Sequence, residues 1–217
     1  MSIRIEHIVC PTPEQMEFVI EGMRNPKNSW HLSDSYINLP NEFVLGEKDK
    51  KLMLQLRNAG AEHRKFMRQM PLFMRITAPQ FWWSEFDTYK VATTRNSCSK
   101  MHKIHVVEFT QDSCSHEAIT ECGGSTLEVY RLVIDELNFL RDMFNKTQEK
   151  RYWRAMIELL PSGYNMTANV SLNYETALSI YNQRKNHKLF EWNANASDSI
   201  CTTLSNIDYS FLITGEE

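Results

Sequence analysis

The sequence predicts an α+β fold in a single domain. The chain has 217 residues, of which 42% are hydrophobic and 24% are charged, and this composition is sufficient for one well-packed core. Local patterns predict the element order β-α-α-β-α-β-α-α-α-α. That order lacks the regular strand–helix alternation of a doubly wound parallel sheet. We therefore expect one mixed domain over residues 1–217.

The first half of the chain begins with two elements that have clear local patterns. Residues 2–10 alternate between apolar and polar side chains, which predicts a strand. Thr12-Pro13-Glu14-Gln15 has the composition of a capping box with proline at the first helical position. We expect a helix to begin there and to end near Pro26. The other elements of this half are expected in this order: a loop over 26–46, a helix over 47–59 with Gly60 at its end, a strand over 72–76 and a helix over 79–92.

The second half of the chain is expected to be mainly helical. The sequence IHVVEF over 104–109 favours a short strand, and residues 110–124 favour a polar loop. Ser125 to Glu128 has the composition of a second capping box and would open the longest helix, over 126–145. The later elements are expected in this order: a helix over 148–160, an extended segment over 165–172, a helix from Asn173 as N-cap to Arg184, and a last helix from Lys188 past residue 200.

Charge, cysteines and hydropathy exclude several classes of protein. The net charge of −3 argues against general nucleic-acid binding, which depends on a strong basic field. The five cysteines are odd in number, widely spaced and without a C-x-x-C pair, so we expect reduced thiols rather than disulfides or a structural zinc site. The N-terminus lacks a signal-peptide pattern, and no apolar stretch approaches membrane-spanning length. We expect a cytoplasmic protein that binds neither nucleic acid nor membranes.

A small-polar segment over residues 93–100 is the first candidate for a binding site. It contains hydroxyls, an amide, a thiol and two cations within Thr-Thr-Arg-Asn-Ser-Cys-Ser-Lys. Two interpretations remain open: the floor of an anion- or nucleotide-binding site, and a solvated loop after a helix. Cys98 lies near Arg95 and Lys100. It is either a thiol whose pKa is lowered by these cations, and therefore reactive, or a small buried residue.

Three histidines and one arginine are further candidates with ordinary alternatives. His63 lies in a turn after a helix, where a surface histidine is also common. Arg184 ends an amphipathic helix, where a cation also interacts favourably with the helix dipole. His102 and His105 would face opposite sides of the predicted strand, so we expect no metal site there. Gly-Gly at 123–124 is expected to be a turn, since no Gly-rich phosphate loop is present.

Taken together, His63, residues 77–102 and the helix from Asn173 to Arg184 resemble the flavin-dependent thymidylate synthases. Order, spacing and length agree over nearly the whole chain after about residue 45. The matching positions are Gly60, His63, Ala78-Pro79, Leu160-Pro161, Asn173 and Asn182-Gln183-Arg184. The resemblance implies a single domain of that family's type, with a central antiparallel sheet and long helices. It also implies a homotetramer whose active sites are shared between subunits.

The chain departs from the family's pattern at most cationic positions. Thr88-Tyr89-Lys90 stands where the family has Arg-His-Arg, and Glu85 replaces the glutamine three residues earlier. In the substrate segment, Cys98 replaces a serine and Lys100 an arginine. Further along, Ile157 and Glu175 stand where the family has arginines. Only His63, Asn173 and Arg184 keep the family's residue among the binding positions.

The resemblance also implies an activity and roles for individual residues. In that family NADPH reduces FAD, and a one-carbon unit from methylenetetrahydrofolate is delivered to C5 of dUMP. Arg184 would bind the pyrimidine and polarise its carbonyl as charge develops. His63 and Lys90 would contact the FAD, and Asn173 would hold its adenine or ribose side. The remaining residues of the substrate site would be Glu85, Cys98, Ser99 and Lys100.

Three functions remain open. The first is FAD-dependent one-carbon transfer to C5 of dUMP or a variant. The second is a non-catalytic homologue that keeps the fold and oligomer as a nucleotide-binding or scaffold protein, with its pocket plugged by side chains such as Trp83 or Tyr89. It is motivated by the lost arginines, since each lost charge-assisted phosphate contact costs about 2 kcal/mol. Arg64, Arg95 and Lys103 are candidates to compensate. The third is a thiol-dependent enzyme that uses Cys98.

Overall fold

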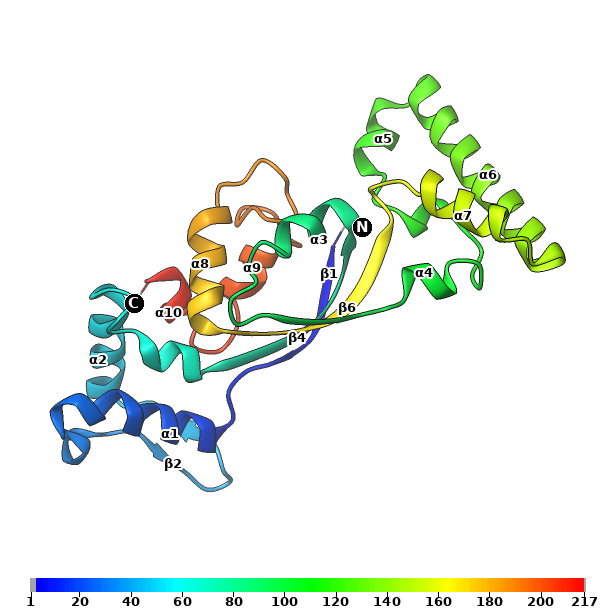
Figure 1. Ribbon diagram of the computed structural model, residues 1–217. Coiled ribbons are helices and arrows are strands. Elements are labelled where there is room, and N and C mark those ends of the chain that lie inside the picture. The colour runs from blue at the N-terminus through cyan, green and yellow to red at the C-terminus, as the bar shows by residue number, and fades with distance from the viewer. Residues whose placement is uncertain (1–2, 217) are drawn as a thin grey trace. The chain divides into compact units, whose positions relative to one another are not determined.

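The computed structural model describes the backbone of residues 3–216 and their side chains apart from those of Lys100 and Met101. A four-stranded antiparallel sheet has the strand order β1-β4-β6-β5, and β2 pairs with β3 in a separate antiparallel hairpin (Figure 1). The strands are β1 (Arg4–Val9), β2 (Tyr36–Ile37), β3 (Phe43–Val44), β4 (Pro71–Pro79), β5 (Thr94–Ser97) and β6 (Asn165–Asn173). The predicted fold class, a mixed α/β fold with a central antiparallel sheet, is confirmed.

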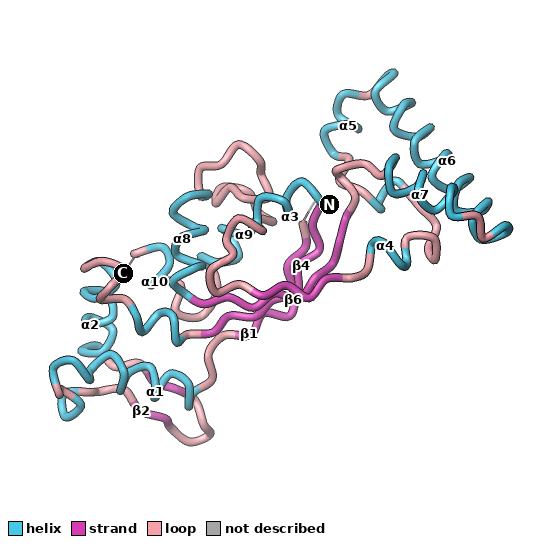
Figure 2. The backbone as a smooth tube through the Cα atoms, in the orientation of Figure 1, coloured by secondary structure: helices cyan, strands magenta, loops and turns pink. Residues whose placement is uncertain are grey.

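Helices make up most of the remaining chain, as the tube in Figure 2 shows. They are α1 (Pro13–Arg24), α2 (Glu47–Asn58), α3 (Gln80–Phe86), α4 (Lys100–Lys103), α5 (Glu117–Cys122), α6 (Gly124–Thr147), α7 (Lys150–Leu159), α8 (Tyr174–Arg184), α9 (Ile200–Ser205) and α10 (Phe211–Thr214). A short 3-10 helix, Lys65–Gln69, precedes β4. No helix in the part of the chain that the structure describes is long and apolar enough to cross a membrane.

The described residues divide into two compact units. The α6 unit comprises residues 3–4, 76–88 and 96–169, and the α8 unit comprises residues 5–75, 89–95 and 170–216. Strands β4 and β6 are each divided between the two units. Nothing tests the prediction of a single domain, which therefore stays a prediction.

The α6 unit has its own apolar core between two helices. The buried residues of α6 recur at helical spacing and pack with Met156 of α7. The core consists of Ile104, Phe109, Cys114, Tyr130, Ile134, Leu137, Leu140 and Met156. Asn138 links the loop before α5 to α6, because its amide group accepts from the backbone N of Phe109 at 2.9 Å and donates to the Phe109 carbonyl at 2.8 Å.

Helix α3 forms an aromatic cluster in the same unit. Trp82 is fully buried, stacks on Phe86 with ring centroids 5.1 Å apart, and meets Trp83 edge-on at 5.0 Å. The indole Nε1 of Trp83 donates to the carbonyl of Met166 in β6 at 3.0 Å. Trp83 therefore anchors α3 to the sheet. Its 3% exposure is that of a core residue, and the idea that it plugs a pocket stays a hypothesis.

The α8 unit contains a buried ionic centre that joins α1, α2 and the segment before β2. Asp49 is completely buried and accepts from the Nε of Arg24 at 2.6 Å. Its second oxygen accepts from Ser33 and Ser35 hydroxyls and from the backbone N–H groups of Asp34 and Ser35. Burial alone would raise the pKa of Asp49. The hydrogen bonds from the serines, Arg24 and Asp34 outweigh burial and hold that pKa below its ordinary value.

Several predicted elements are confirmed. Thr12 and Gln15 form the expected reciprocal capping box at the start of α1, and Pro13 is its first residue. Helix α2 and strand β6 lie where the sequence predicts them. Asn173 is the N-cap of α8, and its side chain accepts from the backbone N of Thr176 at 2.9 Å.

The predicted strand over 104–109 is wrong. Residues 100–103 form α4, and a turn follows in which the N–H of Val106 donates to the Lys103 carbonyl at 3.1 Å. Ile104 and Phe109 point into the helical core, whereas Val106 and Val107 are exposed. The apolar run therefore packs against α6 instead of pairing with a strand. The fourth strand of the sheet is β5, inside the segment that the sequence suggested as a polar loop or site floor.

The predicted boundaries of three helices are also wrong. Helix α3 ends at Phe86 rather than residue 92, because the hydroxyl and backbone N–H of Thr88 both donate to the Glu85 carbonyl. Helix α6 begins at Gly124 with Gly123 as N-cap and no side-chain cap, so Ser125 caps nothing. The last predicted helix does not begin at Lys188, and α9 begins only after Ser199. Between Lys188 and Ser199 the chain forms turns instead. The side chains of Asn193 and Thr202 donate to backbone carbonyls of this region and favour those turns.

Two predicted loops contain short elements. Residues 26–46 include the β2–β3 hairpin, whose register pairs Tyr36 with Val44 and Ile37 with Phe43. Residues 110–124 include α5. Short elements of this kind have too few residues for a periodic pattern, which is why the sequence did not predict them.

Candidate functional site

Helix α8 carries two of the predicted site residues at its two ends. Asn173 caps its amino end, and Arg184 is in its last turn. Because an α-helix rises 1.5 Å per residue, the two positions lie about 16 Å apart along the axis. They therefore belong to two different parts of any binding surface along this helix.

A short segment, residues 89–93, runs beside α8 within the α8 unit. The hydroxyl of Thr176, near the start of the helix, donates to the carbonyl of Val91 at 3.3 Å. The hydroxyl of Tyr89 reaches the end of the helix, where it meets Gln183 and Arg184. The hydroxyl of Thr93 donates to the Tyr89 carbonyl and closes the segment on itself. This segment is part of the stretch in which the family's Arg-His-Arg is replaced.

Arg184 is held by two aromatic residues. Its Nε donates to the phenol oxygen of Tyr89 at 2.8 Å, and the guanidinium carbon lies 5.7 Å from the Tyr89 ring centroid. The same carbon lies 5.3 Å from the ring centroid of Trp192, which is fully buried. These distances are in the range of cation–π contacts. Arg184 is thus a half-buried cation in a defined orientation.

The thiol of Cys201 interacts electrostatically with Arg184. Cys201 is fully buried, and this burial raises its pKa to about 12, although the positive charge of Arg184 acts in the opposite direction. The thiol stays protonated at neutral pH. It therefore contributes no negative charge that would neutralise Arg184.

The amino end of α8 carries a second cationic group, formed by Arg64, Arg68 and Glu175. The Glu175 carboxylate accepts from the guanidinium of Arg68, and its Oε1 lies 3.7 Å from the Nε of Arg64. The hydrogen bond that Arg68 donates to Glu175 raises the pKa of Arg68. Glu175 stands where the resemblance expects an arginine, and two arginines of the preceding segment meet it. Arg64 was predicted as a compensating cation, whereas Arg68 was not predicted.

His63 and Lys90 lie in the same unit but on its surface. His63 has 55% of its side chain exposed, and its Nε2 is 3.9 Å from Oε1 of Glu62. It precedes Arg64 directly, so the chain brings it to the amino end of α8. Lys90 is exposed beside Tyr89. Both positions are open to solvent and accessible to a ligand.

The predicted substrate residues Glu85, Cys98 and Ser99 belong to the α6 unit. Glu85 is in α3, Cys98 is an exposed free thiol after β5, and Ser99 is the N-cap of α4, whose hydroxyl accepts from the backbone N of His102 at 3.1 Å. The side chain of Lys100 lies outside the described part of the structure. Within the α8 unit, the structure brings Tyr89 to Arg184 at the carboxyl end of α8. The roles of Glu85, Cys98, Ser99 and Lys100 in binding a substrate stay predictions.

Half of the small-polar segment over 93–100 is a strand and not a loop. Thr94–Ser97 is strand β5, and the backbone N of Cys98 continues the pairing by donating to the Thr167 carbonyl at 2.9 Å. Its polar side chains are those of an edge strand, of which Thr94, Asn96 and Ser97 are exposed. The solvated-loop interpretation is therefore wrong for these four residues. Binding of an anion by this strand is untested and stays a hypothesis.

Trp192 and Arg68 were missed by sequence reasoning. Trp192 fell inside the helix predicted from Lys188, so no role for it beside Arg184 was considered. Arg68 follows His63 by five residues, just beyond the turn that contains His63, and no role for it was predicted from the sequence. The available signal was that Arg68 is a cation close in sequence to His63 and opposite in charge to Glu175. Its ion pair with Glu175 joins residues 107 positions apart, and no local sequence pattern predicts such a pair.

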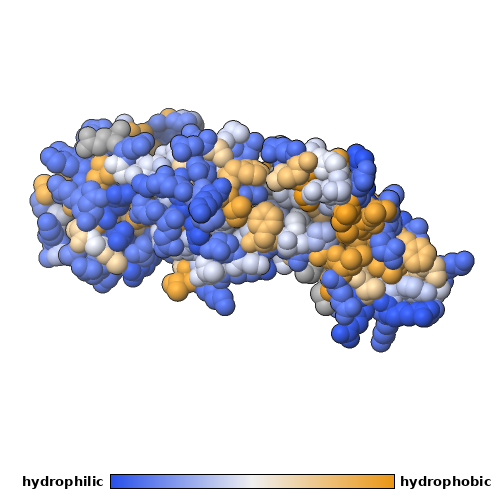
Figure 3. All heavy atoms as spheres, turned by 90° about the horizontal axis from the view of Figure 1, so that it is seen from above, coloured by the Kyte–Doolittle hydropathy of each residue, from blue (hydrophilic) through white to orange (hydrophobic). Residues whose placement is uncertain are grey.

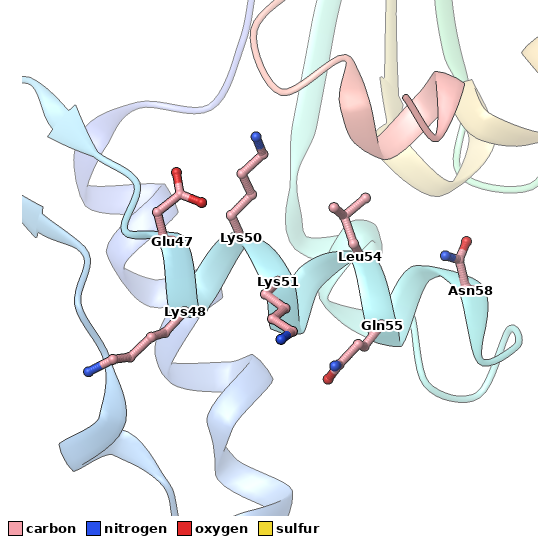
Figure 4. Close-up of a pocket in the computed structure, with 7 residues that line it drawn as sticks. All are labelled: Glu47, Lys48, Lys50, Lys51, Leu54, Gln55 and Asn58. Carbon is pink, nitrogen blue, oxygen red and sulfur yellow. The ribbon is translucent and has the colours of Figure 1, made fainter. Parts of the chain in front are cut away.

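A shallow depression with a volume of about 560 Å3 lies along the exposed side of α2. Residues of this one helix line it, including Lys48, Lys50 and Lys51, and Figure 4 shows that their side chains point in different directions rather than toward one ligand. Such a surface attracts anions weakly but does not converge on a ligand. Among the described residues, no group of three or more His, Cys, Asp or Glu side chains is arranged to hold a metal ion.

The five cysteines are expected to differ strongly in reactivity. Cys98 and Cys122 are exposed, whereas Cys114 and Cys201 are buried and burial raises the pKa of both thiols. Brief treatment of the native protein with iodoacetamide at pH 8 is expected to alkylate Cys98 and Cys122, with Cys114 and Cys201 modified only after guanidinium unfolding. Peptide mass spectrometry measures both. Native labelling of Cys201 as fast as that of Cys98 would contradict the burial described above.

No protein-family model matches the chain, and no curated protein matches its sequence. The fold does match solved structures. A flavin-dependent thymidylate synthase, ThyX, from Helicobacter pylori, complexed with FAD and dUMP, matches over 99% of this chain and 99% of its own, with a TM-score of 0.68 and 14% identity. A second structure of that enzyme with FAD and dUMP covers 98% of this chain and 95% of its own, with a TM-score of 0.66 and 14% identity. The chain therefore has the fold of the flavin-dependent thymidylate synthases over its whole length.

Proposed function

We propose that the chain binds FAD and a pyrimidine nucleotide and transfers a one-carbon unit to C5 of that nucleotide, as a divergent homologue of the flavin-dependent thymidylate synthases. The observation that carries this proposal is the match in fold along the full length of both chains to an enzyme complexed with FAD and dUMP. The oriented Arg184 supports it, because a fixed guanidinium suits the carbonyl groups of a pyrimidine ring. NADPH and methylenetetrahydrofolate would be the co-substrates.

The residues at the amino end of α8 fit an anionic dinucleotide such as FAD. Arg64 and Arg68 carry two positive charges and Glu175 one negative charge, which leaves a formal charge of +1 beside exposed His63. A guanidinium or imidazolium contacts a pyrophosphate through charge-assisted hydrogen bonds. When bound, FAD would supply the redox chemistry of the transfer. The chain's own residues would bind and orient the two ligands.

Arg184 would act on the nucleotide. Its guanidinium would donate hydrogen bonds to a pyrimidine carbonyl oxygen and stabilise negative charge that develops there while C5 reacts. The buried wall formed by Trp192 excludes water from one side of the guanidinium. Excluding water strengthens each electrostatic contact that Arg184 makes. Glu85, Cys98, Ser99 and Lys100 stay proposed as substrate-binding residues of the chain.

Absorption spectroscopy tests the proposal directly. Purified protein incubated with FAD and then desalted is expected to keep the yellow colour of bound flavin and to lose it on addition of NADPH. Nucleotide-dependent release of tritium from the uracil C5 position measures the transfer. A colourless protein that releases no tritium would sink this proposal.

Asn173 allows a sharper test of the flavin site. Asn173→Asp keeps an oxygen that accepts from the Thr176 N–H, so the cap of α8 is retained. It removes the amide donor and adds a negative charge next to the predicted flavin position. We expect reduced FAD retention with an unchanged melting temperature. Asn38→Asp, in the turn between β2 and β3, is the matched control, because it also keeps an oxygen that accepts from a backbone N–H, that of Glu42. Flavin retention should not change in this control.

A second candidate function is a non-catalytic homologue that keeps the fold as a nucleotide-binding or scaffold protein. The specific observation that favours it is the hydrogen bond between Tyr89 and Arg184, which engages the cation that substrate would use. The missing arginines at Thr88, Ile157 and Glu175 favour it as well. This function predicts nucleotide binding without flavin and without turnover.

We also propose a homotetramer with shared active sites, working in the cytoplasm. Helix α6 supports assembly, because Val129, Leu132 and Phe139 are exposed along one side of it at spacings of three and seven residues. Figure 3 shows apolar side chains gathered over the surface of this region. Exposed apolar stripes of this kind commonly mark protein interfaces. Light scattering on the purified protein measures the mass, and a monomer would contradict the assembly.

A further inference from the structure

We propose that Tyr89 is a positioning residue for Arg184, fixing the orientation in which the guanidinium meets a planar, oxygen-bearing ligand. The inference rests on the function proposed above for the identity of that ligand. The contact itself belongs to this chain, since Tyr89 stands where the similar family has histidine. Its role is independent of whether flavin chemistry takes place.

The hydrogen bonds around the phenol oxygen define one orientation. Nε of Arg184 donates to it at 2.8 Å, and the Tyr89 hydroxyl donates onward to Oε1 of Gln183 at 3.1 Å. Gln183 is fixed in turn, because its Nε2 donates to the hydroxyl of Ser179 at 3.0 Å. Each group therefore has a defined role as donor or acceptor. These hydrogen bonds connect Arg184 and Tyr89 to Gln183 and Ser179 of α8.

The aromatic rings fix the remaining freedom of the guanidinium. Tyr89 and Trp192 lie with centroids 6.3 Å apart and their planes inclined by 43°. The guanidinium carbon is within 5.7 Å of both centroids, so the three groups form a compact triangle. The ring of His187 contacts Trp192 with its centroid 6.4 Å away and its plane inclined by 66°. An arginine side chain that is otherwise flexible is thereby preorganised.

The nitrogens of the Arg184 guanidinium that remain for a ligand determine the direction from which that ligand is bound. A guanidinium recognises planar oxygen-bearing groups through two parallel N–H bonds, either from Nε with one terminal nitrogen or from both terminal nitrogens. Tyr89 engages Nε, so the arrangement that uses Nε is closed to a ligand while this hydrogen bond is kept. The contact thereby limits how a pyrimidine carbonyl or a phosphate can meet the guanidinium.

Tyr89 is itself held in place, as a positioning residue must be. The hydroxyl of Thr93 binds its carbonyl, and the carbonyl of Val91 receives the hydroxyl of Thr176 in α8. Both bonds lie in the same unit as Arg184. Removing the Tyr89 hydroxyl alone leaves them intact, so a variant can test orientation without disturbing the segment.

The test compares Tyr89→Phe with the wild-type protein. Isothermal titration with dUMP is expected to give an affinity about tenfold or more weaker in Tyr89→Phe, since the lost hydrogen bond involves a charged donor. The melting temperature should be unchanged within error. The 15N-detected Nε–H signal of Arg184, assigned with Arg184→Lys, should exchange with water faster in Tyr89→Phe. A purely structural role for Tyr89 would not alter this signal.

Tyr181→Phe is the matched control, because it removes a hydroxyl one turn earlier on α8 and should leave both measurements unchanged. Equal or tighter dUMP binding by Tyr89→Phe would overturn the inference, and tighter binding would identify Tyr89 as a plug. If the wild-type protein binds no dUMP, the proposed function fails. The hydrogen-exchange rate of the Arg184 Nε–H then decides by itself whether Tyr89 fixes the orientation of Arg184. Equal exchange rates of the Arg184 Nε–H in both proteins would then overturn the inference, and faster exchange in Tyr89→Phe would uphold the fixed orientation.

Discussion

Replacing Asp49 by asparagine is expected to lower the free energy of unfolding by about 3–5 kcal/mol, because it leaves the buried charge of Arg24 without its counter-ion. Both side chains are almost completely inaccessible, at 0% and 4% exposure. Asp49 also organises the turn before β2 by accepting from Ser33, Ser35 and backbone N–H groups. Chemical denaturation followed by circular dichroism measures the loss.

Two controls and one pH dependence sharpen this result. Glu47→Gln, on the exposed side of the same helix, is expected to change stability little. The double variant Arg24→Met/Asp49→Leu should be more stable than Asp49→Asn, because it removes both charges.

Folding lowers the pKa of Asp49. The contribution of its charge to the free energy of unfolding is therefore complete above the ordinary carboxyl range, near pH 4, and is lost as the pH falls through the lowered pKa. The stability difference between wild type and Asp49→Asn should therefore shrink in acid. A difference that is constant down to pH 3 would contradict this account.

Trp82→Ala is expected to cost about 3–5 kcal/mol in the α6 unit, because a fully buried indole leaves a large cavity. The stacked contact with Phe86 and the edge-on contact with Trp83 would be lost together. Trp83 would then lose one support of the position in which it donates to Met166. Hydrogen exchange read by mass spectrometry measures the loss and locates it, and we expect faster exchange in α3.

Trp30 provides the matched comparison. Its side chain is 49% exposed and makes one hydrogen bond, from Nε1 to Asn25. Trp30→Ala is expected to cost about 1 kcal/mol, although the same atoms are removed. Similar losses for the two variants would show that burial of Trp82 does not govern its contribution.

The outline of the fold follows from local patterns, and the errors arise where tertiary contacts decide. Thr12 and Asn173 were correctly assigned as helix caps, because capping depends on a few neighbouring residues. The segment over 104–109 has the β-branched composition of a strand, but its apolar residues pack against α6. Thr94–Ser97 is polar throughout, and it is a strand because β6 lies beside it. Neither outcome is encoded in a window of ten residues.

The candidate site divides in the same way. Arg184 and Asn173 were identified from the sequence, since a helix with a cap and a terminal cation has a local pattern. The contact of Tyr89 with Arg184 joins residues 95 positions apart in sequence, and Trp192 lay in a segment assigned to the wrong element. Which side chains hold Arg184 could be learned only from the packing of α8 against residues 89–93 and 192.

The pairing of Glu175 with Arg64 and Arg68 has a consequence for how distant relatives are detected. The three side chains together carry the formal charge of one arginine, the residue that the similar family has at the position of Glu175. A ligand responds to electrostatic potential, which belongs to a region of space and not to a place in a sequence. A motif records one residue at one place. When a positive charge is supplied by a neighbouring element instead, the electrostatic potential at that surface is similar although the sequence motif is absent. Comparison of structures can then detect a similarity that comparison of sequences does not.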